Sequence, residues 1–177
     1  MRYRLTKGVG CLLASTVATL ALASPGIAVP SGEQAKAYVW GYIKNVHSGL
    51  CLEIRGDSTA DGATANQWEC NGSDTQLWRL EGVTGSEFSF TFHNKNSGKC
   101  LEIRGDSKAD GATANQWTCN GSATQQWEIQ LKSNPVVWNG NSNKCLEILS
   151  WGTGNGDLAG QWRCHGGNNQ RWNFPAV

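Results

Sequence analysis

Short apolar runs separated by polar turns recur along most of this chain. Phe88–Phe92 (FSFTF) alternates apolar and polar side chains, and Cys51–Ile54 (CLEI) is a short run bounded by turn residues. Short runs of this kind are typical of β-strands, and the Gly- and Asn-rich segments between them are typical of turns. Further predicted strands are Val39–Ile43, Pro135–Trp138, a strand ending in Gln67–Trp68, and Gln76–Trp78. No segment has a helical apolar period, so we predict an all-β fold.

One stretch of 28 residues occurs three times. Its copies run Cys51–Trp78, Cys100–Trp127 and Cys145–Trp172. The second copy matches the first at 24 of 28 positions, and the third matches the first at 13 of 28. A repeat of this period indicates a fold built from equivalent units. With four short strands in each unit, we predict twelve strands.

The start of the chain has a different composition. Arg2, Arg4 and Lys7 precede an uncharged apolar stretch, Val9–Ala23, and small residues follow it. This pattern is typical of a secretory signal peptide, and the stretch is too short for a membrane span. We expect residues 1–28 to be a signal peptide, with cleavage between Ala23 and Ala28, and residues 29–35 to be a short N-terminal segment. The mature protein is therefore expected to be secreted, with no membrane span.

Without this leader the charges nearly balance. Three of the 15 Lys and Arg residues lie in the leader, which leaves 12 against 14 Asp and Glu. A near-neutral chain lacks the basic surface by which proteins bind nucleic acid or anionic membranes. We therefore expect no nucleic-acid partner.

The six cysteines after the leader form three pairs, and the two members of each pair are 19 residues apart. In a secreted protein such a set is typical of disulfides, although sequence alone does not prove their connectivity. The repeat favours one bridge inside each unit: Cys51–Cys70, Cys100–Cys119 and Cys145–Cys164. A zinc site is the alternative, but no CxxC pair occurs and the three histidines are scattered. We expect no metal and no other cofactor.

Each copy carries Cys-Leu-Glu, Gln-Trp-x-Cys and a closing Gln-x-Trp. Three copies of these motifs resemble the ricin-type β-trefoil, the fold of the ricin B chain and of family 13 carbohydrate-binding modules. The resemblance covers residues 36–177, with repeats at about 36–83, 84–132 and 133–177. It implies a monomeric pseudo-threefold barrel of six strands, capped by three hairpins. It also implies a carbohydrate partner, either galactose-type sugars or a plant polysaccharide such as xylan.

The resemblance divides six tryptophans into two sets. Those that close each Gln-x-Trp are expected in the core near the pseudo-threefold axis: Trp78, Trp127 and Trp172. Those two residues before the second cysteine are expected to be exposed platforms for the apolar face of a sugar: Trp68, Trp117 and Trp162. The alternative for the second set is simple packing against the disulfide.

Polar residues around each platform complete the predicted sites. Where the family has Asp after Cys-x, this chain has Glu, whose carboxylate can accept hydrogen bonds from two adjacent hydroxyls. The alternative is a solvated carboxylate that pairs with Arg55 or Arg104. The predicted sugar-binding residues are Glu53, Asn66, Trp68, Asn71, Gln76, Glu102, Asn115, Trp117, Asn120, Gln125, Glu147, Trp162, His165, Asn169 and Gln170. The glutamines have an alternative role in tying down the backbone inside the fold. Gly160 replaces Asn66 and Asn115 in the third unit, so we expect two near-identical sites and one different site.

Other functions find less support. No Gly-x-Ser-x-Gly or HExxH motif occurs, and no catalytic residues stand out, so we expect no enzyme activity. A protease inhibitor or other protein-binding trefoil is the alternative, although no loop is long or distinctive. Arg55–Asp57 and Arg104–Asp106 spell an adhesion tripeptide, which the repetition of one turn explains.

Overall fold

The computed structural model describes residues 39–130 and 134–177, and the expected signal peptide and N-terminal segment lie outside these residues. Twelve short strands are present: β1 (Lys44–Asn45), β2 (Cys51–Ile54), β3 (Ala65–Trp68), β4 (Trp78–Gly82), β5 (Ser89–Asn94), β6 (Cys100–Ile103), β7 (Ala114–Trp117), β8 (Trp127–Ile129), β9 (Val137–Asn139), β10 (Cys145–Ile148), β11 (Ala159–Trp162) and β12 (Trp172–Asn173). The predicted all-β class and the twelve strands are confirmed. Within this part of the chain no helix is long and apolar enough to cross a membrane.

The helical structure in the described residues consists of six single 3-10 turns, two in each unit. They are η1 (Arg55–Asp57), η2 (Asp74–Gln76), η3 (Arg104–Asp106), η4 (Ala123–Gln125), η5 (Leu149–Trp151) and η6 (Asn168–Gln170). The first turn of each unit follows the first strand of the hairpin, and the second turn precedes the Gln-x-Trp tryptophan. Both sets connect strands and bury no apolar face of their own.

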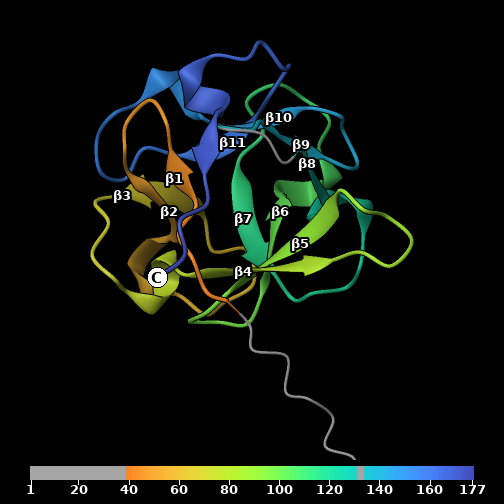
Figure 1. The fold of residues 1–177 in the computed structure, drawn as a ribbon, viewed down its shortest axis with the longest axis horizontal. Helices are drawn as coiled ribbons and strands as arrows, with labels where there is room; N and C mark the ends of the chain where they lie inside the picture. Colours follow the sequence, from red (N-terminus) through yellow and green to blue (C-terminus); the bar gives the residue numbers. More distant parts are fainter. Residues whose placement is uncertain (1–38, 131–133) are drawn as a thin grey trace, which may run out of the picture. The chain divides into compact units, whose positions relative to one another are not determined.

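Six strands, β1, β4, β5, β8, β9 and β12, form a closed ring. Figure 1 labels β1, β4, β5, β8 and β9 of this ring. Antiparallel ladders join β4 to β5, β5 to β8, β8 to β9, and β12 to β1. Two isolated bridges complete the circle: Gly41, just before β1, pairs with Trp78 at the start of β4, and Val136, just before β9, pairs with Arg171, just before β12. The result is the six-stranded barrel that the sequence resemblance implies. Closure leaves no free barrel edge.

Three hairpins cap the barrel, and each comes from one unit. They are β2–β3, β6–β7 and β10–β11, and all three have the same register, in which the first cysteine faces the exposed tryptophan. Single bridges join the hairpins to one another: Thr64 with Asn115, Thr113 with Gly160, and Asn66 with Leu158. The cap is therefore one connected threefold surface.

The core lies where barrel and cap meet. Trp78, Trp127 and Trp172 are at most 1% exposed, as predicted. Each indole Nε1–H donates to the carbonyl of the Leu that follows the first cysteine of the same unit, at 2.9–3.0 Å. Buried indole groups of this kind need such a partner. One tryptophan per unit thus joins the cap to the barrel in the same way.

The three predicted disulfides are confirmed. Cys51 bonds to Cys70, Cys100 to Cys119 and Cys145 to Cys164, so the zinc alternative is wrong for these six cysteines. One His–Cys grouping in the described residues has a metal-like arrangement, with His93 beside Cys100 and Cys119. Its two sulfurs are already bonded to each other, so they are not thiolate ligands.

Four predicted strands have different bounds in the structure. Phe88–Phe92 is shifted to β5 (Ser89–Asn94) and Pro135–Trp138 to β9 (Val137–Asn139), and the two larger differences have a structural reason. Gln76 ends η2 and β4 begins only at Trp78, because the backbone turns at this point: the Gln76 N–H donates to the Ser73 carbonyl at 2.9 Å. In Val39–Ile43 only Gly41 forms bridges, and β1 begins at Lys44. Gly41 lies so close to the C-terminal segment that a Cβ there would be 2.7 Å from the Pro175 carbonyl oxygen. Close approach of two backbones replaces a regular ladder there.

Candidate functional site

Three tryptophans occupy the same place in the three hairpins and are open to solvent. Trp68 ends β3 and is 40% exposed, while its equivalents Trp117 and Trp162 are 42% and 38% exposed. A turn of a neighbouring unit supports each ring: a Cβ built on Gly156 would lie 3.9 Å from Cζ3 of Trp68. An exposed ring on a fixed support has the properties of a sugar platform, which stays a prediction for these residues.

A glutamate on the first hairpin strand lies on the same face as each exposed tryptophan. Glu53 pairs with Asn66, which is two residues from Trp68 and therefore on the same side of the strand. Glu53, Glu102 and Glu147 are only 4–8% exposed. The alternative of a solvated carboxylate paired with a nearby arginine is wrong. Arg55 Nη2 instead donates to the Gly156 carbonyl at 3.3 Å.

The Gln-x-Trp glutamines hold these carboxylates in place. In the second unit, Gln125 accepts from the Asn120 N–H at 2.9 Å, and its Nε2 donates to the Thr118 carbonyl at 3.0 Å and to Glu102 Oε2 at 3.1 Å. Gln76 and Gln170 make the same three contacts in their units. All three glutamines are 0% exposed. The amides therefore position the carboxylate from beneath, which agrees with the backbone-tying alternative and leaves them no surface for a sugar.

A second amide holds the carboxylate in the first two units only. Asn66 Nδ2 donates to Glu53 Oε1 at 3.3 Å, and Asn115 Nδ2 donates to Glu102 Oε1 at 3.1 Å. Both asparagines are at most 1% exposed, so they too act behind the site surface. The third unit has Gly160 at this position. A Cβ there would be 2.6 Å from the Ala112 carbonyl oxygen and 2.9 Å from Leu149 Cδ1, so only glycine fits.

Asn169 does not join the site. Its side chain is fully buried, and Nδ2 donates to the Ile148 carbonyl at 3.2 Å. The Thr124 hydroxyl makes the equivalent bond to the Ile103 carbonyl at 2.9 Å. Asn169 therefore fixes the backbone of the hairpin strand, and the direct sugar contact predicted for it has no accessible surface.

Three exposed residues follow the second cysteines and form the rim of the cap. Their direct part in sugar binding stays a prediction. Asn71 and Asn120 each accept, through Oδ1, a backbone N–H two residues further on, at 2.9 Å. His165 replaces them in the third unit. Its Nδ1 accepts the Gly167 N–H at 3.1 Å, and its Nε2 lies 3.4 Å from Glu147 Oε2. Because Nδ1 is an acceptor, the neutral ring carries its proton on Nε2 and directs it at the carboxylate.

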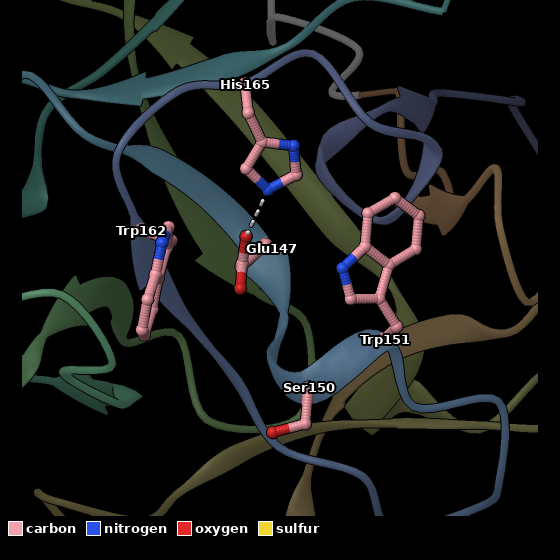
Figure 2. Close-up of a pocket in the computed structure, with 5 residues that line it drawn as sticks. All are labelled: Glu147, Ser150, Trp151, Trp162 and His165. Atoms are coloured by element: carbon pink, nitrogen blue, oxygen red, sulfur yellow. Dashed lines mark ion pairs between the residues drawn. The ribbon is translucent and has the colours of Figure 1, made fainter.

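The third unit forms an open cavity of about 410 Å³. Figure 2 shows its five lining residues, with Glu147 and His165 between two indole rings, those of Trp162 and Trp151. Trp151 is 50% exposed and stacks on His165, with ring centroids 5.7 Å apart. It also meets His47 of the first unit edge-on, with ring centroids 5.2 Å apart.

Trp151 and Ser150 are site residues that we did not predict. They lie in η5, where the first two units have Gly-Asp in η1 and η3. One sequence signal was available: Arg-Gly-Asp in the first two copies becomes Leu-Ser-Trp in the third. Trp151 has no equivalent tryptophan in the first two units, so the comparison of the three copies predicted no role for it.

Contacts between units fix the hairpin turns that support the platforms. Gln116 Nε2 of the second unit donates to the Ser58 and Ala60 carbonyls of the first unit, at 2.8 and 3.0 Å. Gln161 binds the Ser107 and Ala109 carbonyls, and Gln67 binds the Gly152 and Gly154 carbonyls, in the same arrangement. Each pair of neighbouring units is thus joined by the same glutamine–carbonyl hydrogen bonds.

Two of the three interfaces between units also have an ion pair. Lys99 lies 2.7 Å from Asp61, and Lys144 lies 2.6 Å from Asp110. The hydrogen bond from each lysine holds the pKa of its aspartate below the usual range. At the third interface Asn155 takes the place of the aspartate and accepts the Glu69 N–H at 2.8 Å. No ion pair of the described residues joins this interface at that point.

Comparisons with known proteins agree with this geometry. The family model for the ricin-type beta-trefoil lectin domain matches residues 39–172. No curated protein matches the chain in sequence. Among solved structures, the designed 3-fold symmetric protein ThreeFoil has 30% identity and a TM-score of 0.74, over 78% of this chain and 99% of its own.

Two natural proteins are also similar. The exo-β-1,3-galactanase 1,3Gal43A from Clostridium thermocellum has 30% identity and a TM-score of 0.75 over 78% of this chain, which spans only 30% of the galactanase. The C-half of the earthworm R-type lectin, solved in complex with GalNAc, has the same fold, with 17% identity and a TM-score of 0.63 over 78% of this chain and 99% of its own. The barrel, the three capping hairpins and the family match together show that the chain belongs to the ricin-type β-trefoil lectin domain family.

Proposed function

We propose that this chain is a secreted, non-enzymatic lectin that binds carbohydrate through up to three shallow sites. One observation carries the proposal: an exposed indole and a buried, positioned carboxylate share one face of each hairpin. The family is a carbohydrate-binding one, which supports the same conclusion. Secretion is supported by the leader-like sequence of residues 1–28.

The recognition mechanism follows from the two groups. A pyranose places its C–H-rich face on the indole, and its hydroxyls donate to the accessible edge of the carboxylate. The glutamine beneath each site fixes the carboxylate before the ligand arrives, so little order is lost on binding. A shallow site of this kind is expected to have a Kd of about 1 mM for a monosaccharide.

Three such sites around one monomer favour a polymeric ligand. Simultaneous contact with two or three sites raises the apparent affinity by ~10² or more when the spacing fits. Galactose-type sugars and plant polysaccharides such as xylan are the ligands that we propose. The similarity to a galactanase and to a lectin solved with GalNAc favours the galactose type.

A glycan array, run beside a panel of proteases, tests the proposal against the protein-binding alternative. We expect binding to a subset of neutral glycans and no inhibition of any protease. Calorimetry with a bound polysaccharide and with its monosaccharide then measures the gain from multivalency. Protease inhibition without any glycan signal would overturn the proposal, and equal affinity for polymer and monomer would overturn multivalent use.

A further inference from the structure

The third site is built differently from the first two, and three observations indicate how. In the first two units, each carboxylate oxygen of Glu53 or Glu102 receives one amide donor. In the third unit both donors, Gln170 and His165, go to Oε2 of Glu147. Among the described residues, no donor reaches Glu147 Oε1. Glu147 lines the 410 Å³ cavity, so this oxygen is the one that its bonds leave available to a ligand hydroxyl.

The second observation is the direction of Trp151. Figure 2 shows its indole nitrogen turned toward Glu147 and the space between the two rings. No acceptor within the described part of the chain bonds this N–H. The equivalent residues of the first two units, Asp57 and Asp106, carry carboxylates. The third site therefore offers a donor where the other sites have an acceptor.

The third observation is backbone strain. Ser150 and Trp151 both have φ near +56°. Gly56 and Asp57 adopt the same left-handed pair in the first unit, with φ of 67° and 53°. Glycine and aspartate tolerate this region, whereas a bulky aromatic residue rarely adopts it. The surrounding structure holds Trp151 there in spite of that preference, which is typical of residues at functional sites.

Charge limits what this cavity can accept. Its lining residues in the described structure include one carboxylate, Glu147, and no lysine or arginine. The nearest cationic candidate, His165, already directs Nε2 at that carboxylate. Leu149, which packs against Gly160, occupies the position that has Arg55 and Arg104 in the other units. The third unit therefore lacks a positive charge at this position. An acidic sugar would meet the negative charge of Glu147 without a lysine or arginine in the lining to offset the repulsion.

We infer that Trp151 is a ligand-contacting, specificity-determining residue of the third site, and that the charge of Glu147 makes this site selective for neutral pyranosides. The sugar lies on Trp162, donates a hydroxyl to Glu147 Oε1, and accepts the Trp151 N–H through a ring or substituent oxygen. This inference rests on the proposed lectin function and assigns the third site a different ligand preference from the first two.

The nine tryptophans provide a direct readout, since each indole N–H gives one nitrogen–proton NMR signal. The probes are the methyl β-glycosides of galactose, glucose, xylose and N-acetylglucosamine, with methyl β-galacturonide and methyl β-glucuronide as acidic counterparts. We expect at least one neutral glycoside to shift the Trp151 and Trp162 signals together. The acidic counterpart of that sugar should bind the third site at least about tenfold more weakly.

Two variants separate ligand contact from packing. Trp151→Phe keeps an aromatic ring but removes the donor, and should weaken binding at the third site by about three- to tenfold, as expected for one hydrogen bond. Trp151→Asp copies the first two units and should weaken it further. The control is His47→Asn, which copies Asn96 and Asn141, removes the edge contact to Trp151 and should leave affinity unchanged.

The outcomes distinguish this inference from the proposed function. Shifts at Trp68 and Trp117 without shifts at Trp151 would overturn the inference and leave the lectin function standing. Equal loss in Trp151→Phe and His47→Asn would assign Trp151 a packing role and overturn the inference. If no probe moves any of the exposed tryptophan signals, the inference and the proposed function both fail.

Discussion

The three units of this protein are equivalent in the interior but differ at the rim of the cap. Inside, the tryptophan of each unit donates to the equivalent leucine carbonyl of that unit, and each unit uses a buried glutamine to hold a glutamate. At the rim, the third unit replaces Arg-Gly-Asp by Leu-Ser-Trp, and His165 replaces Asn71 and Asn120. The fold requires equivalence in the core, because each unit buries its apolar face against the other two. The surface has no such requirement, so differences between the sites collect there.

The largest expected effect tests the equivalence of the core. Trp78→Ala, Trp127→Ala and Trp172→Ala should each lower the free energy of unfolding by ~3–5 kcal/mol, because each removes a large buried side chain and its indole hydrogen bond. Chemical denaturation measures this loss. Trp68→Ala is the matched control, with its ring 40% exposed, and should cost much less. A loss in one core variant that differs strongly from the other two would break the threefold account.

A smaller effect tests the difference between the third unit and the first two behind the site surface. Gly160→Asn copies the first two units but places a Cβ against the Ala112 carbonyl and Leu149. Overpacking of this kind is expected to cost about 1–3 kcal/mol. The double variant with Leu149→Arg should recover part of this loss, because it removes the leucine that fills the asparagine's space. Thermal melts of the two variants make the comparison, and an unchanged melting temperature for Gly160→Asn would contradict it.

The smallest expected effect concerns the two interfaces that have ion pairs. The folded pKa values of Asp61 and Asp110 lie below the unfolded value of about 3.9, so these groups stabilise the fold above that pH. That stability is lost as the pH falls through the folded pKa values. The double variant Asp61→Asn/Asp110→Asn, which copies Asn155, should therefore lose less stability than the wild type when acidified below pH ~4.

Denaturation curves measured from neutral to strongly acidic pH test this prediction. The double variant Lys99→Leu/Lys144→Leu copies Leu50 at the third interface. It should also lose less of its free energy of unfolding than the wild type when the pH is lowered. If the wild type and both double variants lose the same free energy of unfolding on acidification, the pH dependence arises from other groups.

Much of the architecture could be predicted, because residues that recur at the same place in all three units have the same structural role. Cysteines 19 residues apart in three copies identified the disulfides, and the closing tryptophans identified the core. Strand ends were less predictable. Gln76 looks like part of a strand, but its amide bonds to both sides of the second cysteine, which requires a turn before Trp78.

The candidate site was predictable only in part, for a related reason. Glu, Trp and Gln recur in every unit and can be recognised by position, although the sequence did not reveal that the glutamines and Asn66 lie under the surface. Trp151 breaks the repeat, and it joins the site beside residues that are distant in sequence, Glu147 and His165 among the lining residues and His47 at its edge. Such contacts exist only once the barrel closes.

The central claim is that the buried tryptophans stabilise the fold and the exposed ones bind sugar. The most direct test is the triple variant Trp68→Ala/Trp117→Ala/Trp162→Ala, measured for binding to an immobilised polysaccharide and for thermal stability. The account predicts nearly complete loss of binding with little change in melting temperature, and a partial loss for Trp68→Ala alone because the second unit is a near copy. Normal binding by the folded triple variant would contradict it.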